Sequence, residues 1–189
     1  MLQTNPQDFI ALFEVFSIGL TNRIISTRQV IDWADAVIQR DAEPDYFIIE
    51  LAMCGQRNIE GLISLLQAYV GEAKPRVAGH ATLGLLHHAY AADQANFYRV
   101  VQTMDWLATH GRVNEEESRL LYGIDDAHTM AVEGVYGAVN DVIAFVVHTL
   151  AFYQAFRLDN VAQWAEIDAE LGAKRESFYR QLEGLHPYL

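Results

Sequence analysis

The sequence predicts an all-α protein, and three observations lead to that fold class. Apolar residues recur along the chain with the 3.6-residue period of amphipathic helices, and only four prolines interrupt 189 residues. Residues that favour helix starts and helix ends also punctuate these periodic segments. We therefore expect a single domain over residues 1–189, built as one bundle of about eight or nine helices. Stacked antiparallel helical hairpins would be one arrangement of such a bundle.

Several helix starts can be identified from their capping residues. Asn5-Pro6-x-Asp8 offers an N-cap, a proline at the first helical position and an early acidic residue. Ser26-x-x-Gln29 has the spacing of a capping box. Asn114 precedes Glu115–Glu117, three acidic residues that the helix dipole favours in a first turn. We interpret this acidic triplet as part of a cap rather than as a binding site.

Glycines mark several helix ends. Gly55, Gly71 and Gly111 each follow an apolar periodic segment, as C-terminal caps do. The predicted helices are therefore 6–21, 27–41, 44–54, 58–70, 75–92, 94–110, 114–136, 138–157 and 160–184. The seventh and eighth could also form one continuous helix, in which Gly134 and Gly137 would let another helix approach closely.

The charge balance restricts the class of partner. The chain has 13 basic and 25 acidic residues and a net charge of −12, and no segment concentrates the basic ones. Nucleic acids and anionic membrane surfaces would repel such a chain, whereas a basic protein partner is compatible with it. An acidic surface that only aids solubility is the simpler interpretation. The single cysteine, Cys54, excludes an intramolecular disulfide and is expected to be a buried thiol.

Nothing in the sequence predicts a membrane location. The N-terminus has no basic region followed by an apolar run, so no signal peptide is expected. The longest uncharged apolar run, Val142–Phe156, is too short to cross a bilayer comfortably and contains polar residues. We therefore predict a soluble cytoplasmic protein.

The segment Val139–Phe156 is apolar on almost every side. A helix of this kind must be covered all round, either at the centre of its own bundle or by a second copy in a homodimer. Asp141 and His148 lie seven residues apart and so share one face of this helix. They are the candidate catalytic residues if they form an acid–base pair, and otherwise a polar pair satisfied by neighbouring helices.

Histidines supply the candidate ligand-binding residues. His80, His87 and His88 share one predicted helix, but His80 and His87 are about 10 Å apart along its axis. One metal ion could not bind both unless the helix bends, so surface or core-edge histidines are the simpler interpretation. A metal or acid–base site shared with another helix is the alternative.

Two acid-to-histidine pairs have the spacing found in di-iron bundles. They are Asp125-x-x-His128 and Glu183-x-x-His186. A di-iron site needs carboxylates from two further helices, and this composition produces such pairs by chance. We keep Asp125 and His128 as candidate ligand-binding residues and predict no metal and no cofactor.

Motifs of the common enzyme classes are missing from the sequence. It has no phosphate-binding glycine loop, no G-x-S-x-G elbow, no H-E-x-x-H and no paired cysteines. We therefore predict a non-catalytic acidic helical protein that binds another protein, in the manner of small bacterial immunity, antitoxin or adaptor proteins. The alternative is a small helical enzyme or a metal- or ligand-binding bundle that uses the histidines and aspartates above.

Overall fold

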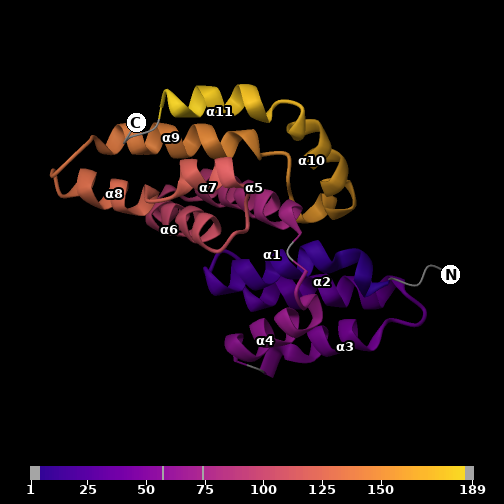
Figure 1. Cartoon of the computed structure of the whole chain (residues 1–189). Helices are drawn as coiled ribbons and strands as arrows, with labels where there is room; N and C mark the ends of the chain where they lie inside the picture. The colour runs from indigo at the N-terminus through magenta and orange to yellow at the C-terminus, as the bar shows by residue number, and fades with distance from the viewer. Residues whose placement is uncertain (1–4, 57, 74, 186–189) are drawn as a thin grey trace. The chain divides into compact units, whose positions relative to one another are not determined.

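The computed structural model describes residues 5–56, 58–73 and 75–185, and these residues form helices and no strand, which confirms the all-α prediction. The α-helices, labelled in Figure 1, are α1 (Ile10–Thr21), α2 (Thr27–Arg40), α3 (Tyr46–Ala52), α4 (Ile59–Val70), α5 (Arg76–Ala92), α6 (Phe97–Thr109), α7 (Glu115–Leu121), α8 (Ile124–Val132), α9 (Val139–Phe152), α10 (Trp164–Gly172) and α11 (Arg175–Glu183). Short 3-10 helices cover Pro6–Phe9, Met53–Gln56, Gln94–Asn96 and Leu158–Gln163.

The described residues form more helices than the eight or nine predicted, because two predicted helices are each divided. The range 114–136 breaks at Gly123, which has a left-handed φ of 75° and donates its N–H to Asp105 Oδ1 at 2.7 Å. The range 160–184 breaks after Gly172, and this break brings Arg175 into an ion pair with Asp168. Capping boxes were predicted correctly at Ser26 and are also present at Asn114.

The seventh and eighth predicted helices are separate, so the alternative of one continuous helix through residues 114–157 is not found. Gly134 and Gly137 lie in the connection between α8 and α9, with left-handed φ angles of 69° and 74°. A Cβ atom added at either glycine would meet nothing within 4 Å, so no helix of the described residues approaches closely at either position. These glycines instead provide the backbone conformation of a connecting loop.

The chain divides into two compact units, an N-terminal unit (Met1–Ala78) and a C-terminal unit (Gly79–Leu189). A single domain over the whole chain stays a prediction. No helix among the described residues combines the length and the apolarity that a bilayer crossing requires.

Helix α1 is the enclosed helix of the N-terminal unit. Every residue from Leu12 to Leu20 is buried, and α1 packs against α4 while α2 packs against α3. Phe13 makes edge-on ring contacts with Trp33 and Tyr69, at centroid distances of 5.5 and 5.6 Å. Cys54 is fully buried, as predicted, and its thiol lies 3.2 Å from the Glu50 carbonyl oxygen.

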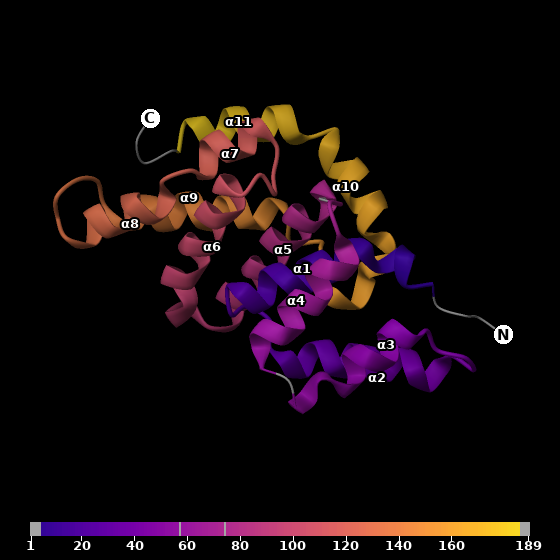
Figure 2. The same cartoon turned by 60° about the horizontal axis from the view of Figure 1, so that its bottom comes forward.

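Helix α9 is not enclosed, which corrects the expectation that it lies at the centre of the bundle. It forms an antiparallel hairpin with α8 and packs against α11 (Figures 1 and 2). Val142, Phe145 and Val146 are buried, whereas Ala144 and Val147 on another face are exposed. Val142, Phe145 and Val146 are covered within the unit without a second copy of the chain, and a homodimer stays an untested prediction.

Gly84 allows α5 to approach the C-terminal end of α9 closely. A Cβ atom at this position would lie 2.6 Å from both the Tyr153 carbonyl oxygen and Phe156 Cβ. We predict that Gly84→Ala lowers the free energy of unfolding by about 1–3 kcal/mol, because backbone would have to shift. The matched control is Gly172→Ala, whose nearest neighbour would be Arg175 Nη1 at 3.9 Å. It should be neutral or stabilising by up to about 1 kcal/mol. Urea denaturation measures both, and equal effects would contradict the close approach.

Candidate functional site

A buried imidazole, His80 on α5, is bound at both ring nitrogens by carboxylates. Its Nδ1 lies 2.6 Å from Asp168 Oδ1 and its Nε2 lies 3.0 Å from Glu117 Oε2. The His80 ring is 1% exposed and stacks on the Tyr153 ring at 5.4 Å between centroids. Arg175 Nη2 also lies 2.9 Å from Nδ1 and opposes its protonation, but the two carboxylates facing the two nitrogens favour the imidazolium form, because only that form donates from both positions.

Glu117 on α7 is the centre of the cluster. Its side chain is 3% exposed and accepts hydrogen bonds from four donors: the His80 ring at 3.0 Å, the Asn114 backbone N–H at 3.0 Å, the Tyr153 hydroxyl at 2.5 Å and the Tyr179 hydroxyl at 2.8 Å. An ionised carboxylate has about four acceptor positions, so Glu117 has none left for another molecule. The Asn114 side chain closes the arrangement by donating to the Tyr179 oxygen at 2.9 Å.

Arg175 on α11 balances the charge of the cluster. Its guanidinium forms an ion pair with Asp168, and its Nε lies 4.0 Å from Glu117 Oε1. With His80 protonated, the two carboxylates face two cations. Burying charges is tolerated when they are paired and hydrogen-bonded in this way. We refer to His80, Glu117, Tyr153, Asp168, Arg175 and Tyr179 as the His80–Glu117 cluster.

The pKa directions agree with this charge assignment. Burial by itself lowers the pKa of His80, but its hydrogen bonds to Asp168 and Glu117 outweigh burial and raise it above the ordinary value. Burial raises the pKa of Glu117, but the bond and charge of His80, with the Tyr153 hydroxyl, bring it down to about 2. Burial and the nearby Glu117 charge raise the pKa of Tyr153, so its phenol stays a neutral donor.

The cluster leaves little space for a substrate. The cavity beside Glu117, Tyr153 and Tyr179 has a volume of about 10 Å³, which is room for about one water molecule. Its other lining residues are mostly apolar: Leu83, Leu120, Leu121, Thr149, Phe178 and Leu182. With its acceptors occupied and no room beside it, the arrangement suits structural stabilisation better than acid–base chemistry on a bound molecule.

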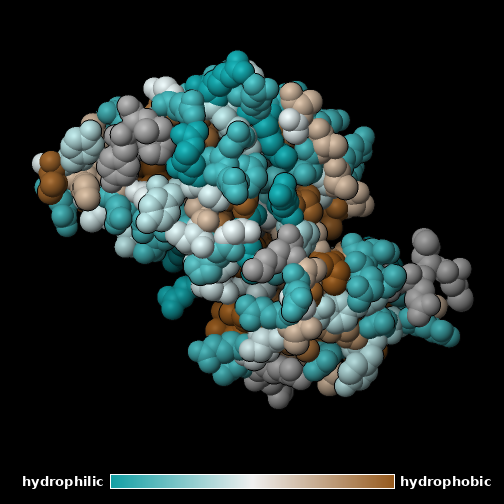
Figure 3. All heavy atoms as spheres, viewed as in Figure 1, coloured by the Kyte–Doolittle hydropathy of each residue, from teal (hydrophilic) through white to brown (hydrophobic). Residues whose placement is uncertain are grey.

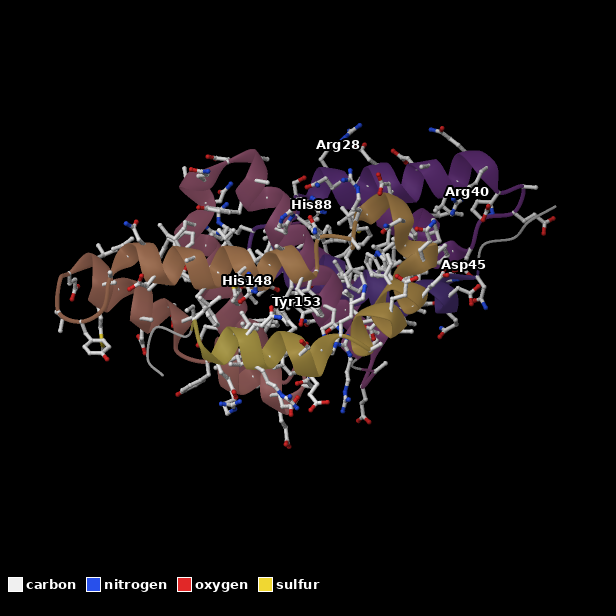
Figure 4. The ribbon with its side chains drawn as sticks, turned by 90° about the horizontal axis from the view of Figure 1, so that it is seen from above. Arg28, Arg40, Asp45, His88, His148 and Tyr153 are labelled. Carbon is white, nitrogen blue, oxygen red and sulfur yellow. The ribbon has the colours of Figure 1, made fainter. Side chains whose placement is uncertain are left out.

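The candidate catalytic residues Asp141 and His148 lie outside this cluster. Both are exposed on α9, and the His148 ring stacks on Phe178 at a centroid distance of 5.8 Å (Figure 4). The face that they share also carries the buried Phe145, so the two residues lie at the edge of the α9 packing surface. A catalytic role for the two residues stays an untested prediction.

The candidate ligand residues of α5 are separated by the fold. His80 joins the cluster, whereas His88 Nε2 lies 3.0 Å from the Gln154 carbonyl oxygen. His87 contacts the edge of the His88 ring, at 5.1 Å between centroids, and its buried Nδ1 has no hydrogen-bond partner. Partial burial and the neighbouring His88 lower the pKa of His87. The structure thus brings only His80 of the three into contact with carboxylates.

Asp125 and His128 do not form a metal site with other described residues. The His128 ring packs against Phe97 at 5.1 Å between centroids, and its Nδ1 has no hydrogen-bond partner. Partial burial and the nearby Asp105 raise the pKa of Asp125. No group of three or more metal-ligating side chains occurs in the part of the chain that the structure describes. The second predicted pair ends at His186, which lies outside the described residues.

Most members of the cluster were missed by reasoning from the sequence. Glu117 was interpreted as a capping residue, which it is, but it also faces inward to His80. No local sequence pattern marks Tyr153, Tyr179 and Arg175 as members, because their contact with Glu117 depends on how α9 and α11 pack. One signal was present: a histidine on an apolar helix needs partners, and the third acid of the Glu115–Glu117 triplet has helical spacing from buried Leu120 and Leu121.

Comparison with known proteins adds no assignment, since no protein-family model, curated protein or solved structure matches the chain. The site must therefore be interpreted from its own geometry.

We predict that Glu117→Gln lowers the free energy of unfolding by on the order of 3–5 kcal/mol. The change keeps the side-chain volume but leaves His80 and Arg175 with less negative charge and turns an amide NH₂ toward donors. The matched control is Glu116→Gln in the same helical turn, where the side chain is exposed and the change should stay within about 0.5 kcal/mol. Equal losses in both variants would show that the helix dipole, rather than the cluster, accounts for the effect.

The cluster should also make stability depend on pH. His80 has a raised pKa in the folded state, so its contribution is fully present below its unfolded value of about 6.5 and is lost as the pH rises through the folded pKa. Glu117 has a lowered pKa, so its contribution is present above about 4.5 and is lost as the pH falls toward about 2. Urea denaturation should give a greater decrease in stability above pH 6.5 for the wild type than for His80→Gln. A His148→Gln control should follow the wild type, and a wild-type curve parallel to that of His80→Gln would contradict the assignment.

Proposed function

We propose that the protein is a non-catalytic acidic protein of the cytoplasm that binds a basic surface of another protein. The observation that carries the proposal is the loop between α8 and α9, which exposes large apolar side chains. Val132, Val135 and Tyr136 are 62%, 69% and 58% exposed. Exposed apolar groups clustered in this way are typical of interaction sites. Figure 3 shows a hydrophobic residue at the end of the hairpin, in a surface that is otherwise mostly hydrophilic.

The loop holds these side chains in a defined conformation. The Val135 N–H donates to the Met130 carbonyl oxygen at 2.9 Å, and the Gly134 N–H donates to the Ala131 carbonyl oxygen at 3.2 Å. The left-handed conformation of Gly134 allows α8 to end with these hydrogen bonds, as in the C-terminal capping motifs of other helices. A loop ordered before binding loses less conformational entropy when a partner covers it.

The charge around the loop favours a basic partner. The sequence has no lysine or arginine between Arg119 and Arg157, whereas Asp125, Asp126, Glu133 and Asp141 lie in that interval. Three of these carboxylates, on Asp126, Glu133 and Asp141, are exposed. An apolar centre with carboxylates around it is complementary to an apolar patch with lysines or arginines around it. Bacterial immunity, antitoxin and adaptor proteins are the class of binder that we propose.

The His80–Glu117 cluster supports a non-catalytic role. Its central carboxylate has its acceptor positions occupied by protein donors, and its cavity of about 10 Å³ admits no organic substrate. The buried thiol of Cys54, with no second cysteine, fits a reducing compartment.

We predict that the double variant Val135→Ser, Tyr136→Ser loses the partner. Affinity capture with the tagged chain should retain a protein at low salt, and mass spectrometry identifies that protein. The purified partner should then bind the wild type in calorimetry. The loop variant should bind it at least about tenfold more weakly, which corresponds to about 1.4 kcal/mol. Added salt should weaken the wild-type complex, since it screens exposed charges.

The control is Tyr122→Ser, which removes an exposed tyrosine outside the loop and should bind as the wild type does. The proposal fails if the wild type retains no protein at low salt, or if the loop variant binds the purified partner with unchanged affinity.

A further inference from the structure

Helix α3 and the 3-10 turn that follows it are apolar on two opposite faces. One face, with Phe47, Ile48, Leu51 and Cys54, is buried in the N-terminal unit. The other face consists of Tyr46, Ile49, Glu50 and Met53, which have the i, i+3, i+4, i+7 spacing of one helix side. Tyr46 is 77% and Met53 is 75% exposed. Three of the four residues of this second face, the α3 face, are apolar or aromatic, and such side chains are normally covered.

We propose that the α3 face binds an amphipathic helix of a partner protein, with basic residues beside the apolar stripe of that helix. This inference rests on the proposed protein-binding function but uses a different surface from the α8–α9 loop. Docking of one helix on another through residues at i, i+3, i+4 and i+7 is a common mode of peptide recognition. The four residues of the α3 face provide two helical turns for such contacts.

The charge of the surrounding segment determines the sign of the partner. Between Arg40 and Arg57 the sequence contains four acidic residues and no basic one; Asp41 is buried beside Arg40, whereas Glu43 is exposed and Asp45 is half-buried. Asp45, labelled in Figure 4, is the N-cap of α3 and accepts a hydrogen bond from the Phe47 N–H at 2.8 Å, which fixes one carboxylate at the start of the helix. Lysines or arginines beside the apolar stripe of a partner helix would complement these carboxylates, whereas acidic residues there would be repelled.

The size of the hollow on the α3 face favours side chains over a small molecule. Tyr46, Ile49, Glu50 and Met53 line a hollow of about 230 Å³. Pockets for small molecules usually measure about 300–1,000 Å³ and have several polar groups that orient the ligand. Here the Glu50 carboxylate and the Tyr46 hydroxyl are the polar groups of the lining. The hollow therefore suits one or two apolar side chains that a helix projects.

Methionine methyl NMR on the full-length protein tests the proposal, because Met53 lies on the α3 face and Met130 lies near the α8–α9 loop. The probe is a synthetic helix of about 18 residues with leucines along one face and lysines elsewhere, and the control probe carries glutamate at every lysine position. We expect the lysine peptide to shift the Met53 signal to saturation and the glutamate peptide to leave it unchanged. Tyr46→Ser should weaken the binding at least about tenfold, and Tyr122→Ser should not.

Three results of the peptide experiment would overturn the inference. They are no Met53 shift with the lysine peptide, an equal shift with the glutamate peptide, and unchanged binding by Tyr46→Ser. A dimer in sedimentation that Tyr46→Ser and Met53→Ser convert to a monomer would also overturn it, since a second copy would then cover the α3 face. If the lysine peptide binds while no captured partner depends on the α8–α9 loop, the inference about the α3 face stands and the proposed function of the loop fails. If instead a captured partner depends on the loop while the lysine peptide does not bind, the proposed function stands and the α3 face fails.

Discussion

The Glu117 carboxylate is the constraint on which the C-terminal unit depends. It lies out of contact with water, where an unpaired charge would be very unfavourable, and four protein donors surround it. Its cluster joins α5, α7, α9, α10 and α11 through His80, Tyr153, Asp168, Arg175 and Tyr179. Because the partners come from helices far apart in the sequence, the charges are compensated only when these helices are assembled. A buried charge of this kind therefore favours one helix arrangement over alternatives with similar apolar burial.

The acidic residues and the histidine of the His80–Glu117 cluster bind one another, so we expect partners to bind at other, exposed surfaces. The features that resemble an acid–base site are already satisfied by one another, whereas large apolar side chains are exposed on the α8–α9 loop and the α3 face. Both surfaces lie in segments that contain acidic residues and no lysine or arginine. Apolar contact would supply most of the affinity of such surfaces, and charge would select the partner and steer its approach.

The sequence predicted the helices well and their burial less well. Capping residues located most helix starts, because an N-cap acts within one turn and is visible locally. Periodicity failed at Gly123 and Gly172, where a short break leaves the apolar pattern nearly intact. It also selected α9 as the enclosed helix, although α1 is the one buried along its length and α3 is the one left with an exposed apolar face. Composition says how apolar a helix is, but only packing determines which sides are covered. His80 was found as a candidate, whereas its partners 37 and 88 residues away were not, since their approach is set by the fold.

The protonation state of His80 tests the account most directly. Long-range ¹H–¹⁵N NMR of the imidazole nitrogens at neutral pH distinguishes the imidazolium from either neutral tautomer. The cluster requires both His80 nitrogens to carry protons at pH 7, each directed at a carboxylate, with titration above the ordinary histidine pKa. A neutral His80 at pH 7, or a His80 that titrates below about 6.5, would contradict the compensated charge cluster at the centre of the C-terminal unit.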